Sequence, residues 1–115
     1  MSDTELNILR ESLDLLILKS LSWGPRHGYD VAEWIQGATN AALLIDEGTL
    51  YPALHRLARR KLVDTEWGVS ENNRRAKYYT ITAAGRARLR AHSPVWQRCA
   101  DGITAALRDG VPVPG

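Results

Sequence analysis

The segment that most constrains the fold runs from residue 47 to residue 60, with the sequence EGTLYPALHRLARR. Three leucines in it recur at i, i+4 and i+7, the spacing that places side chains on one face of an amphipathic helix; they are Leu50, Leu54 and Leu57. Pro52 belongs in the first turn, because only there does a missing backbone N–H cost no intrahelical hydrogen bond. The segment therefore predicts a helix that begins around residues 48–51 and ends near residue 61.

The face of this helix opposite the leucines carries aromatic, imidazole and guanidinium groups and no acid. It consists of Tyr51, Pro52, His55, Arg56 and Arg59. Basic helix faces are often simply solvated, so the helix alone leaves its role open. The positive end of the helix dipole, beside Thr49 and Tyr51, also suits an anion, and the combination is typical of a helix that enters the major groove of DNA by its first turns.

The period of the sequence changes after this helix. Residues 62–67 alternate apolar and polar side chains as a half-buried strand does, and residues 77–82 are rich in β-branched and aromatic residues. The polar segment 68–76 between them predicts a turn, and Asn73 tolerates the left-handed backbone that a turn requires. A hairpin is therefore expected, with basic groups at its tip and on its return strand: Arg74, Arg75 and Lys77.

Two further helices are predicted before the basic one, at about residues 4–22 and 27–38, and residues 43–45 could form a very short strand. Three helices followed by a basic hairpin describe an α+β, mainly α, winged helix-turn-helix with a two-stranded wing. The first helix is apolar on two sides, which calls for a second packing partner. Leu15 and Leu18 lie on the extra apolar side, and another copy of the chain is the simplest partner.

A last helix is expected after Thr82, a good N-cap, and Pro94 should kink or restart it. Its apolar residues keep one phase across the proline and form a narrow seam, which suits a partner subunit; they include Trp96, Ala100, Ile103 and Leu107, with Cys99 beside them. The expected organisation is a DNA-binding domain at residues 1–82, a dimerisation helix at 83–108 and a flexible tail at 109–115.

The composition excludes several classes of protein. A chain of 115 residues forms one domain, and its single cysteine allows no internal disulfide and fits a reducing compartment. No signal peptide or membrane-spanning run is evident, so a cytoplasmic location without membrane partners is expected. The three histidines have no metal-ligand spacing, and no nucleophile or phosphate-loop motif is present. Neither an enzyme, a metal nor a cofactor is predicted.

With helix and hairpin in place, the chain resembles the PadR family of transcriptional regulators, specifically the small subfamily with one C-terminal helix. The resemblance lies in an ordered set of segments: 13–18 (LDLLIL), 27–29 (HGY), 48–54 (GTLYPAL), 66–67 (EW), 77–79 (KYY), 82–85 (TAAG) and Trp96. It implies a homodimeric DNA-binding protein, usually a repressor, whose first and last helices form the dimer interface. It also implies that a small aromatic or planar effector changes the affinity for operator DNA.

Carried onto this sequence, the resemblance assigns the groove of double-stranded DNA to Thr49, Tyr51, Pro52, His55 and Arg56. It assigns phosphates to Arg74, Arg75 and Lys77, with Tyr29 as a weaker candidate and Arg59 as a backbone contact. Trp96 would lie at the dimer interface, or face a ligand, or simply pack. Three positions depart from the family pattern: Lys61 and Asn73 stand where glycine is common, and Pro94 interrupts the last helix.

The main alternative is a winged helix that contacts another protein instead of DNA. The outward arginines and the basic hairpin argue against it, and weak salt dependence of binding would argue for it. A dimer bound to DNA should read a pseudo-palindromic operator with half-sites about 34–36 Å apart, or a multiple of that spacing.

Overall fold

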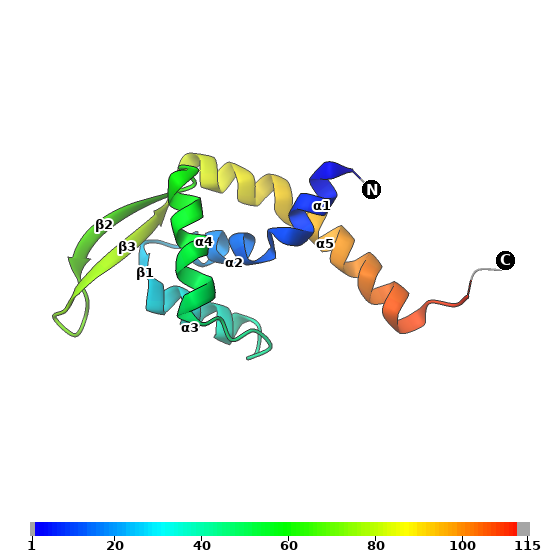
Figure 1. Cartoon of the computed structure of the whole chain (residues 1–115), viewed down its shortest axis with the longest axis horizontal. Coiled ribbons are helices and arrows are strands. Elements are labelled where there is room, and N and C mark those ends of the chain that lie inside the picture. Colours follow the sequence, from blue (N-terminus) through cyan, green and yellow to red (C-terminus); the bar gives the residue numbers. More distant parts are fainter. Residues whose placement is uncertain (1, 113–115) are drawn as a thin grey trace.

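The computed structural model describes residues 2–112, without the side chains of residues 8–10. Within that part of the chain five helices and three strands follow one another (Figure 1). In order they are α1 (Asp3–Arg10), α2 (Ser12–Ser20), β1 (Arg26–His27), α3 (Gly28–Ala38), α4 (Glu47–Arg59), β2 (Val63–Val69), β3 (Arg75–Ile81) and α5 (Ala83–Asp109). This arrangement confirms the mainly helical winged helix-turn-helix, with α3 and α4 as the helix pair and β2 and β3 as the wing.

The core lies where α2, α3 and α4 meet the base of the wing. The three leucines of the α4 stripe are buried there, beside Val31 and Ile35 of α3. Val63 and Ile81, which pair across β2 and β3, close the core from the sheet side. The leucine stripe thus fixes α4 against the rest of the domain and turns its other face outward, as the sequence predicted.

The first predicted helix is in fact two helices, α1 and α2, separated at Glu11. The expectation that Leu15 and Leu18 face a partner subunit is also wrong for this structure. Their exposed fractions are 8% and 0%, because α2 is surrounded by α3, α4 and α5 of its own chain. The extra apolar side of this helix is therefore explained within one chain. Ile8 and Leu9 also belong to the apolar residues of the predicted first helix, but their side chains lie outside the described part.

Helix α4 begins at Glu47, slightly earlier than Pro52 suggested. The side chain of Asp46 caps it by accepting a hydrogen bond of 2.8 Å from the backbone N–H of Thr49. Pro52 consequently lies beyond the first turn and withholds a hydrogen bond from the carbonyl of Gly48, which is exposed to solvent. The cap at Asp46, and not the proline, sets the start of the helix.

The sheet has the order β1-β3-β2 and is antiparallel throughout. The predicted hairpin is confirmed, with Val63 opposite Ile81 at its base and Val69 opposite Arg75 near its tip. The third strand is β1, which sequence patterns missed because it is only two residues long. The short strand suggested at residues 43–45 is not formed.

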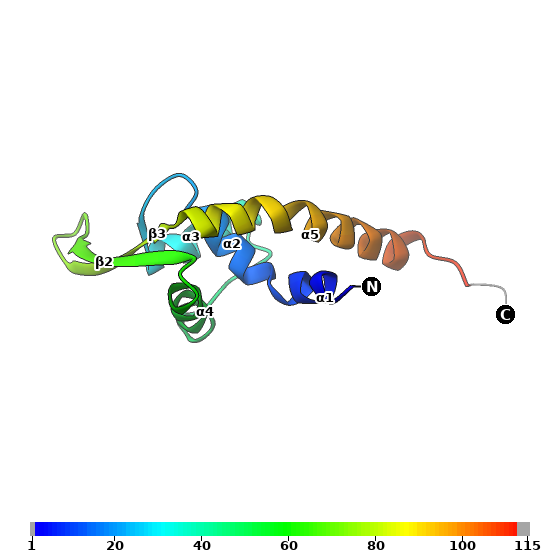
Figure 2. The ribbon, with the colours of Figure 1, turned by 90° about the horizontal axis from the view of Figure 1, so that it is seen from above.

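Helix α5 runs without a break through Pro94, although its ribbon bends near its middle in Figure 1. Thr82 caps it as predicted, accepting a hydrogen bond from Gly85, and its hydroxyl donates to the carbonyl of Lys61 at the end of α4. Lys61 itself takes the left-handed backbone (φ 61°) that glycine commonly supplies. The outer half of α5 extends beyond the domain, on the far side from the wing (Figures 1 and 2).

Two carboxylates at the start of α2 join three helices. Glu11 forms an ion pair with Arg88 of α5, and its carboxylate lies 3.2 Å from Nδ1 of His92 on the same helix. Asp14, one turn later, contacts Arg56 of α4 at 3.4 Å, and Arg60 lies within 4 Å of both carboxylates. We call these six residues the carboxylate cluster. It links α4 to α5 through α2.

Burial raises the pKa of the Asp14 carboxyl above its ordinary value of 3.8, although Arg56 and Arg60 oppose the change. The folded chain therefore disfavours the ionised carboxylate, and Asp14 costs stability at every pH where it is charged. That cost should disappear as the pH falls through the raised pKa toward 3.8.

We therefore predict that Asp14→Asn raises the Tm at pH 7, because it removes a charge that the fold disfavours while keeping the shape of the side chain. The gain over the wild type should shrink as the pH is lowered toward 3.8. Thermal unfolding followed by circular dichroism over pH 3–8 measures it. Asp64→Asn, at an exposed position, is the matched control and should follow the wild type. A lower Tm for Asp14→Asn at pH 7 would contradict the prediction.

Candidate nucleic-acid interface

The outward face of α4 is the exposed centre of the candidate interface. The predicted residues on it are all exposed: Thr49, Tyr51, Pro52, His55, Arg56 and Arg59. Figure 2 shows α4 on the side of the domain opposite α5, and all six residues are exposed in the described part of the chain. The outward face of α4 is therefore accessible, as insertion into a groove of DNA requires.

The register of the wing separates its charges onto two faces. Successive side chains of a strand alternate between faces, so Arg75 and Lys77 share a face with the buried Tyr79 and Ile81. This face packs on α4 at its base and continues outward as a basic wall. Asp64 and Glu66 of β2 lie on the other face. The basic groups are thereby turned to the side on which α4 lies.

Arg75 is held on this wall by Trp67, whose ring centre lies 4.5 Å from the guanidinium. Trp67 is 57% exposed, and Thr65 is exposed too. The half-buried strand predicted from their alternation with Val63 is thus wrong beyond its first residue, because the hairpin extends past the core. Trp67 serves as a platform for Arg75 and not as a core residue.

The wing tip is a short turn closed by its own backbone. Ser70 donates its N–H to the carbonyl of Arg74 at 2.8 Å and accepts, through its own carbonyl, the N–H of Asn73 at 2.9 Å. Asn73 has φ 57°, the left-handed conformation expected of it. Asparagine thus fills the role of the glycine usual at this place, and exposed Arg74 follows it directly.

The start of α3 supplies the third side of the interface. His27 caps the helix by accepting the N–H of Asp30 at 3.3 Å, and its ring contacts Tyr78 edge-on. Tyr29 is 66% exposed. A hydrogen bond with Glu33 raises the pKa of the Tyr29 hydroxyl, so this phenol stays neutral. The histidine organises the turn, while the tyrosine remains available for contact.

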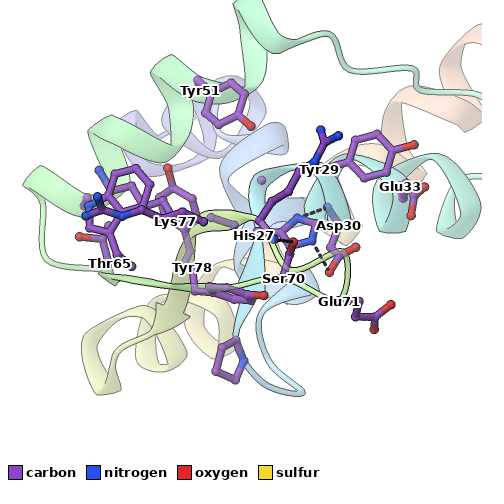
Figure 3. Close-up of a pocket in the computed structure, with 18 of the residues that line it drawn as sticks. His27, Tyr29, Asp30, Glu33, Tyr51, Thr65, Ser70, Glu71, Lys77 and Tyr78 are labelled. Atoms are coloured by element: carbon purple, nitrogen blue, oxygen red, sulfur yellow. Dashed lines mark hydrogen bonds and ion pairs between the residues drawn. The ribbon is translucent and has the colours of Figure 1, made fainter.

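These three elements line one open groove of about 1270 Å³ (Figure 3). Seven of the predicted DNA-binding residues line it: Tyr29, Tyr51, Pro52, His55, Arg74, Arg75 and Lys77. The groove also includes residues that sequence patterns did not indicate as site residues, among them His27, Thr65, Trp67 and Tyr78. The alternation of the strands would have identified Thr65 and Trp67 as site residues if the hairpin had been expected to extend beyond the core.

Three predicted residues lie elsewhere on α4. Thr49 and Arg56 are on the flank that faces α2, and Arg59 is opposite the leucine stripe. Arg56 does not point freely outward, because one of its Nη atoms contacts the buried Asp14. The sequence could not show this ion pair, since its partners are 42 residues apart.

Tyr51 reaches across to α3 and lies directly over Gly28. A Cβ atom at residue 28 would come within 2.7 Å of the Tyr51 hydroxyl oxygen, closer than real contacts allow. Gly28 is therefore required for the close approach of this aromatic side chain, and not for an unusual backbone angle. Both residues belong to the lining of the groove.

Two kinds of feature are absent from the part of the chain described above. Between residues 2 and 112, every helix is too short or too polar to span a bilayer. In the same range, no three His, Cys, Asp or Glu residues gather as a set of metal ligands.

Comparisons with known proteins agree on one family. Residues 17–91 match the model of the "Transcriptional regulator PadR-like family". A protein of Lysinibacillus sphaericus, described as uncharacterized, is 34% identical over 83 residues, which are 72% of this chain and 76% of that protein.

Solved structures give the same result. A transcriptional regulator from Clostridium thermocellum superimposes with a TM-score of 0.75 at 27% identity, over 89% of this chain and 99% of that one. A PadR family transcription regulator from Clostridium difficile gives a TM-score of 0.68, also at 27% identity, over 83% and 97% of the two chains. The likeness includes α5 and not only the winged domain.

We predict that Gly28→Ala displaces Tyr51 and gains no stability, whereas the matched control Gly37→Ala, on the same helix with nothing within 4 Å of the new atom, gains roughly 0.5–1 kcal/mol. Urea unfolding measures both. In a Tyr51→Ala background the obstacle is gone, and Gly28→Ala should then gain as much as Gly37→Ala. Equal gains for both glycines in the wild-type background would show that Tyr51 does not occupy this position.

Proposed function

Because the chain belongs to the PadR-like family of transcriptional regulators, whose members are regulators and not enzymes, we propose that it represses transcription by binding a specific operator in double-stranded DNA. It would act as a homodimer in the cytoplasm, where its DNA is, and would need no cofactor. The observation that carries this proposal is the shared orientation of the exposed α4 face and the basic wall of the wing, with the acids Asp64 and Glu66 turned away.

The geometry supports a division of roles. An α-helix with its side chains is about 10–12 Å wide and fills a major groove about 12 Å wide. With α4 in that groove, Tyr51, Pro52 and His55 would approach base edges. The wing would then lie along the neighbouring backbone, with Arg74, Arg75 and Lys77 at phosphates and Arg59 near the backbone further along. Tyr29 and Thr49 would make additional contacts from two helix N-termini.

The proposed dimer rests on the outer half of α5. Leu107 is 84% exposed and Ile103 46%, although both are large and apolar. Burying such a side chain against a second subunit would contribute roughly 1.5–3 kcal/mol. Cys99 and Ala100 are half-buried on the same helix, and Trp96 is anchored to Ser12 at the start of α2 by a hydrogen bond of 2.7 Å. Two-fold symmetry would then favour a pseudo-palindromic operator.

A small aromatic or planar effector that changes DNA affinity completes the proposal. The groove at α4 and the wing is the DNA face itself, and the second described hollow, beside α3 and residues 44–47, contains no residue of α5. In the proposed dimer, an effector near Trp96 would lie close to the contact between the two subunits. Repeating the DNA-binding assay below with added planar aromatic compounds tests this part, and no change for any of them would count against it.

We predict that Arg74→Ala with Arg75→Ala weakens binding to all DNA sequences and makes the log–log salt slope about 1.8 less steep, because each phosphate that is no longer neutralised changes it by about 0.9. Fluorescence anisotropy with DNA from upstream of the protein's own gene, against scrambled DNA over a salt series, measures this. By contrast, Tyr51→Ala should reduce the preference for the specific sequence.

Arg108→Ala is the matched control for this measurement, because Arg108 is an exposed arginine at the far end of α5. It should leave the binding unchanged. A wild-type protein with no sequence preference and a shallow salt slope would instead support the protein-contact alternative. Equal losses on specific and scrambled DNA for all variants would refute the division of roles.

We predict that Leu107→Glu shifts the protein from dimer to monomer, because it places a charge in the proposed seam. Size-exclusion chromatography with light scattering over a concentration series measures the mass directly. The control is Leu44→Glu, which adds the same charge at a leucine that is 69% exposed in the connector before α4. If both variants keep the wild-type mass, the outer half of α5 is not the dimer contact.

A further inference from the structure

Arg56 has an unusual position for a side chain on a DNA-binding helix. Its Nη2 atom lies 3.4 Å from Oδ1 of Asp14, whose side chain is only 8% exposed, while about half of the Arg56 side chain is exposed. Asp14 stands on α2, next to the core residues Leu15 and Leu18, so the carboxylate has a fixed place. One end of the guanidinium is thus held by the protein and the other faces outward.

The flank of α4 that carries Arg56 is the one away from the wing. Tyr51, His55 and Ala58 line the groove shared with the wing, whereas Arg56 and Arg60 point toward α2. A helix that fills the major groove has a phosphate backbone along each of its flanks. The wing covers one of these backbones in the proposed complex. Arg56 is placed at the other.

We propose that Asp14 is a positioning residue for DNA binding, which holds the guanidinium of Arg56 at the α2 flank of α4 so that its outward N–H groups meet a DNA phosphate. This proposal rests on the proposed function. Guanidinium has five donors in a rigid fork, so one edge can bind the carboxylate while another binds the phosphate. The rotamer entropy of the long side chain is then lost on folding instead of on binding.

The surrounding charges allow this role. Asp14 also contacts Arg60 at 3.8 Å, so the local charge stays positive toward an approaching phosphate. Glu11, the other carboxylate of the cluster, is taken up by Arg88 and His92 of α5. The cluster therefore supplies one carboxylate to α4 and one to α5, with Arg60 between them.

The burial of Asp14 is not explained by stability. Burial raises the pKa of its carboxyl, which means that the fold disfavours the charge. Replacing a buried ionic group by a neutral one of similar volume is often neutral or stabilising, and both arginine partners are exposed enough to turn to water. The stability of the fold therefore does not account for this buried carboxylate, whereas a role in DNA binding does.

The direction in which Asp14→Asn changes DNA affinity distinguishes positioning from simple charge attraction. Asp14→Asn makes the protein one unit more positive, so electrostatic attraction alone would tighten DNA binding. Positioning predicts the reverse: operator affinity should fall about threefold to tenfold, the cost of immobilising one long side chain at the interface. In an Arg56→Ala background, Asp14→Asn should cause no further loss of operator affinity. Anisotropy titrations of wild type, both single variants and the double variant, at pH 7.5 and fixed salt, complete the cycle.

Glu11→Gln is the matched control, because it neutralises the neighbouring, partly buried carboxylate just before α2, which contacts Arg60 and α5 but not Arg56. Operator affinity should not fall in this variant, because the contact between Arg56 and Asp14 is kept. Tighter or unchanged binding by Asp14→Asn overturns the proposal, as does an equal loss in the presence and absence of Arg56. If the wild-type protein binds DNA without sequence preference, the proposed function itself is refuted. That outcome is distinct from those that refute only the positioning role of Asp14.

Arg56→Lys provides a second route that leaves Asp14 in place. Lysine keeps the charge but not the fork, so it cannot bind the carboxylate and the phosphate with two edges of one plane. The affinity of the Arg56→Lys protein for the operator should fall nearly as far as that of the Arg56→Ala protein. Wild-type affinity in Arg56→Lys would show that a point charge suffices and would overturn the proposal.

Discussion

Burial of the leucine stripe of α4 is the interaction on which the rest of the structure depends. Leu50, Leu54 and Leu57 occupy the centre of the core, and each buried leucine of this kind contributes roughly 1.5–3 kcal/mol. Because a helix is rigid, fixing one face fixes the other. The exposure of Pro52, His55 and Arg59 is thus a consequence of the core, and the candidate interface requires no separate device to present it.

In the wing, as in α4, burial of apolar residues sets the direction of the exposed side chains. Its base is pinned in the core by Val63 and Ile81, and the two-residue period then sets the direction of every side chain beyond them. A slip of one residue in the register would exchange Arg75 and Lys77 for the residues of the opposite face. The hydrophobic pair at the base therefore controls the electrostatics of the exposed tip, several residues away.

Sequence patterns were most informative where one element carries the signal. The period of the leucines, the alternation of the strands and the threonine cap of α5 each depend on neighbours in the chain. The elements predicted from them, which are α4, the hairpin and α5, all formed. Sequence patterns failed where the outcome depends on a second element. The two-residue strand β1 forms by pairing with β3, and Leu15 and Leu18 are buried because α2 packs against three later helices. The periodicity also did not indicate the break at Glu11. The prediction from Pro52 placed the start of α4 too late, because the cap at Asp46 outweighs the one hydrogen bond that the proline removes.

The sequence by itself determined the class of fold, the outward basic face of α4 and the basic character of the wing, because periodicity and local charge are properties of contiguous residues. Only the tertiary structure decided which of those basic groups face the groove and which are bound within the protein. Arg56 and Arg75 look alike as exposed arginines in the sequence, yet one contacts a buried carboxylate of α2 and the other lies on the ring of Trp67. The reason is that the direction of a long side chain is set by the nearest opposite charge or aromatic ring in space, and for Arg56 that partner is distant in the chain.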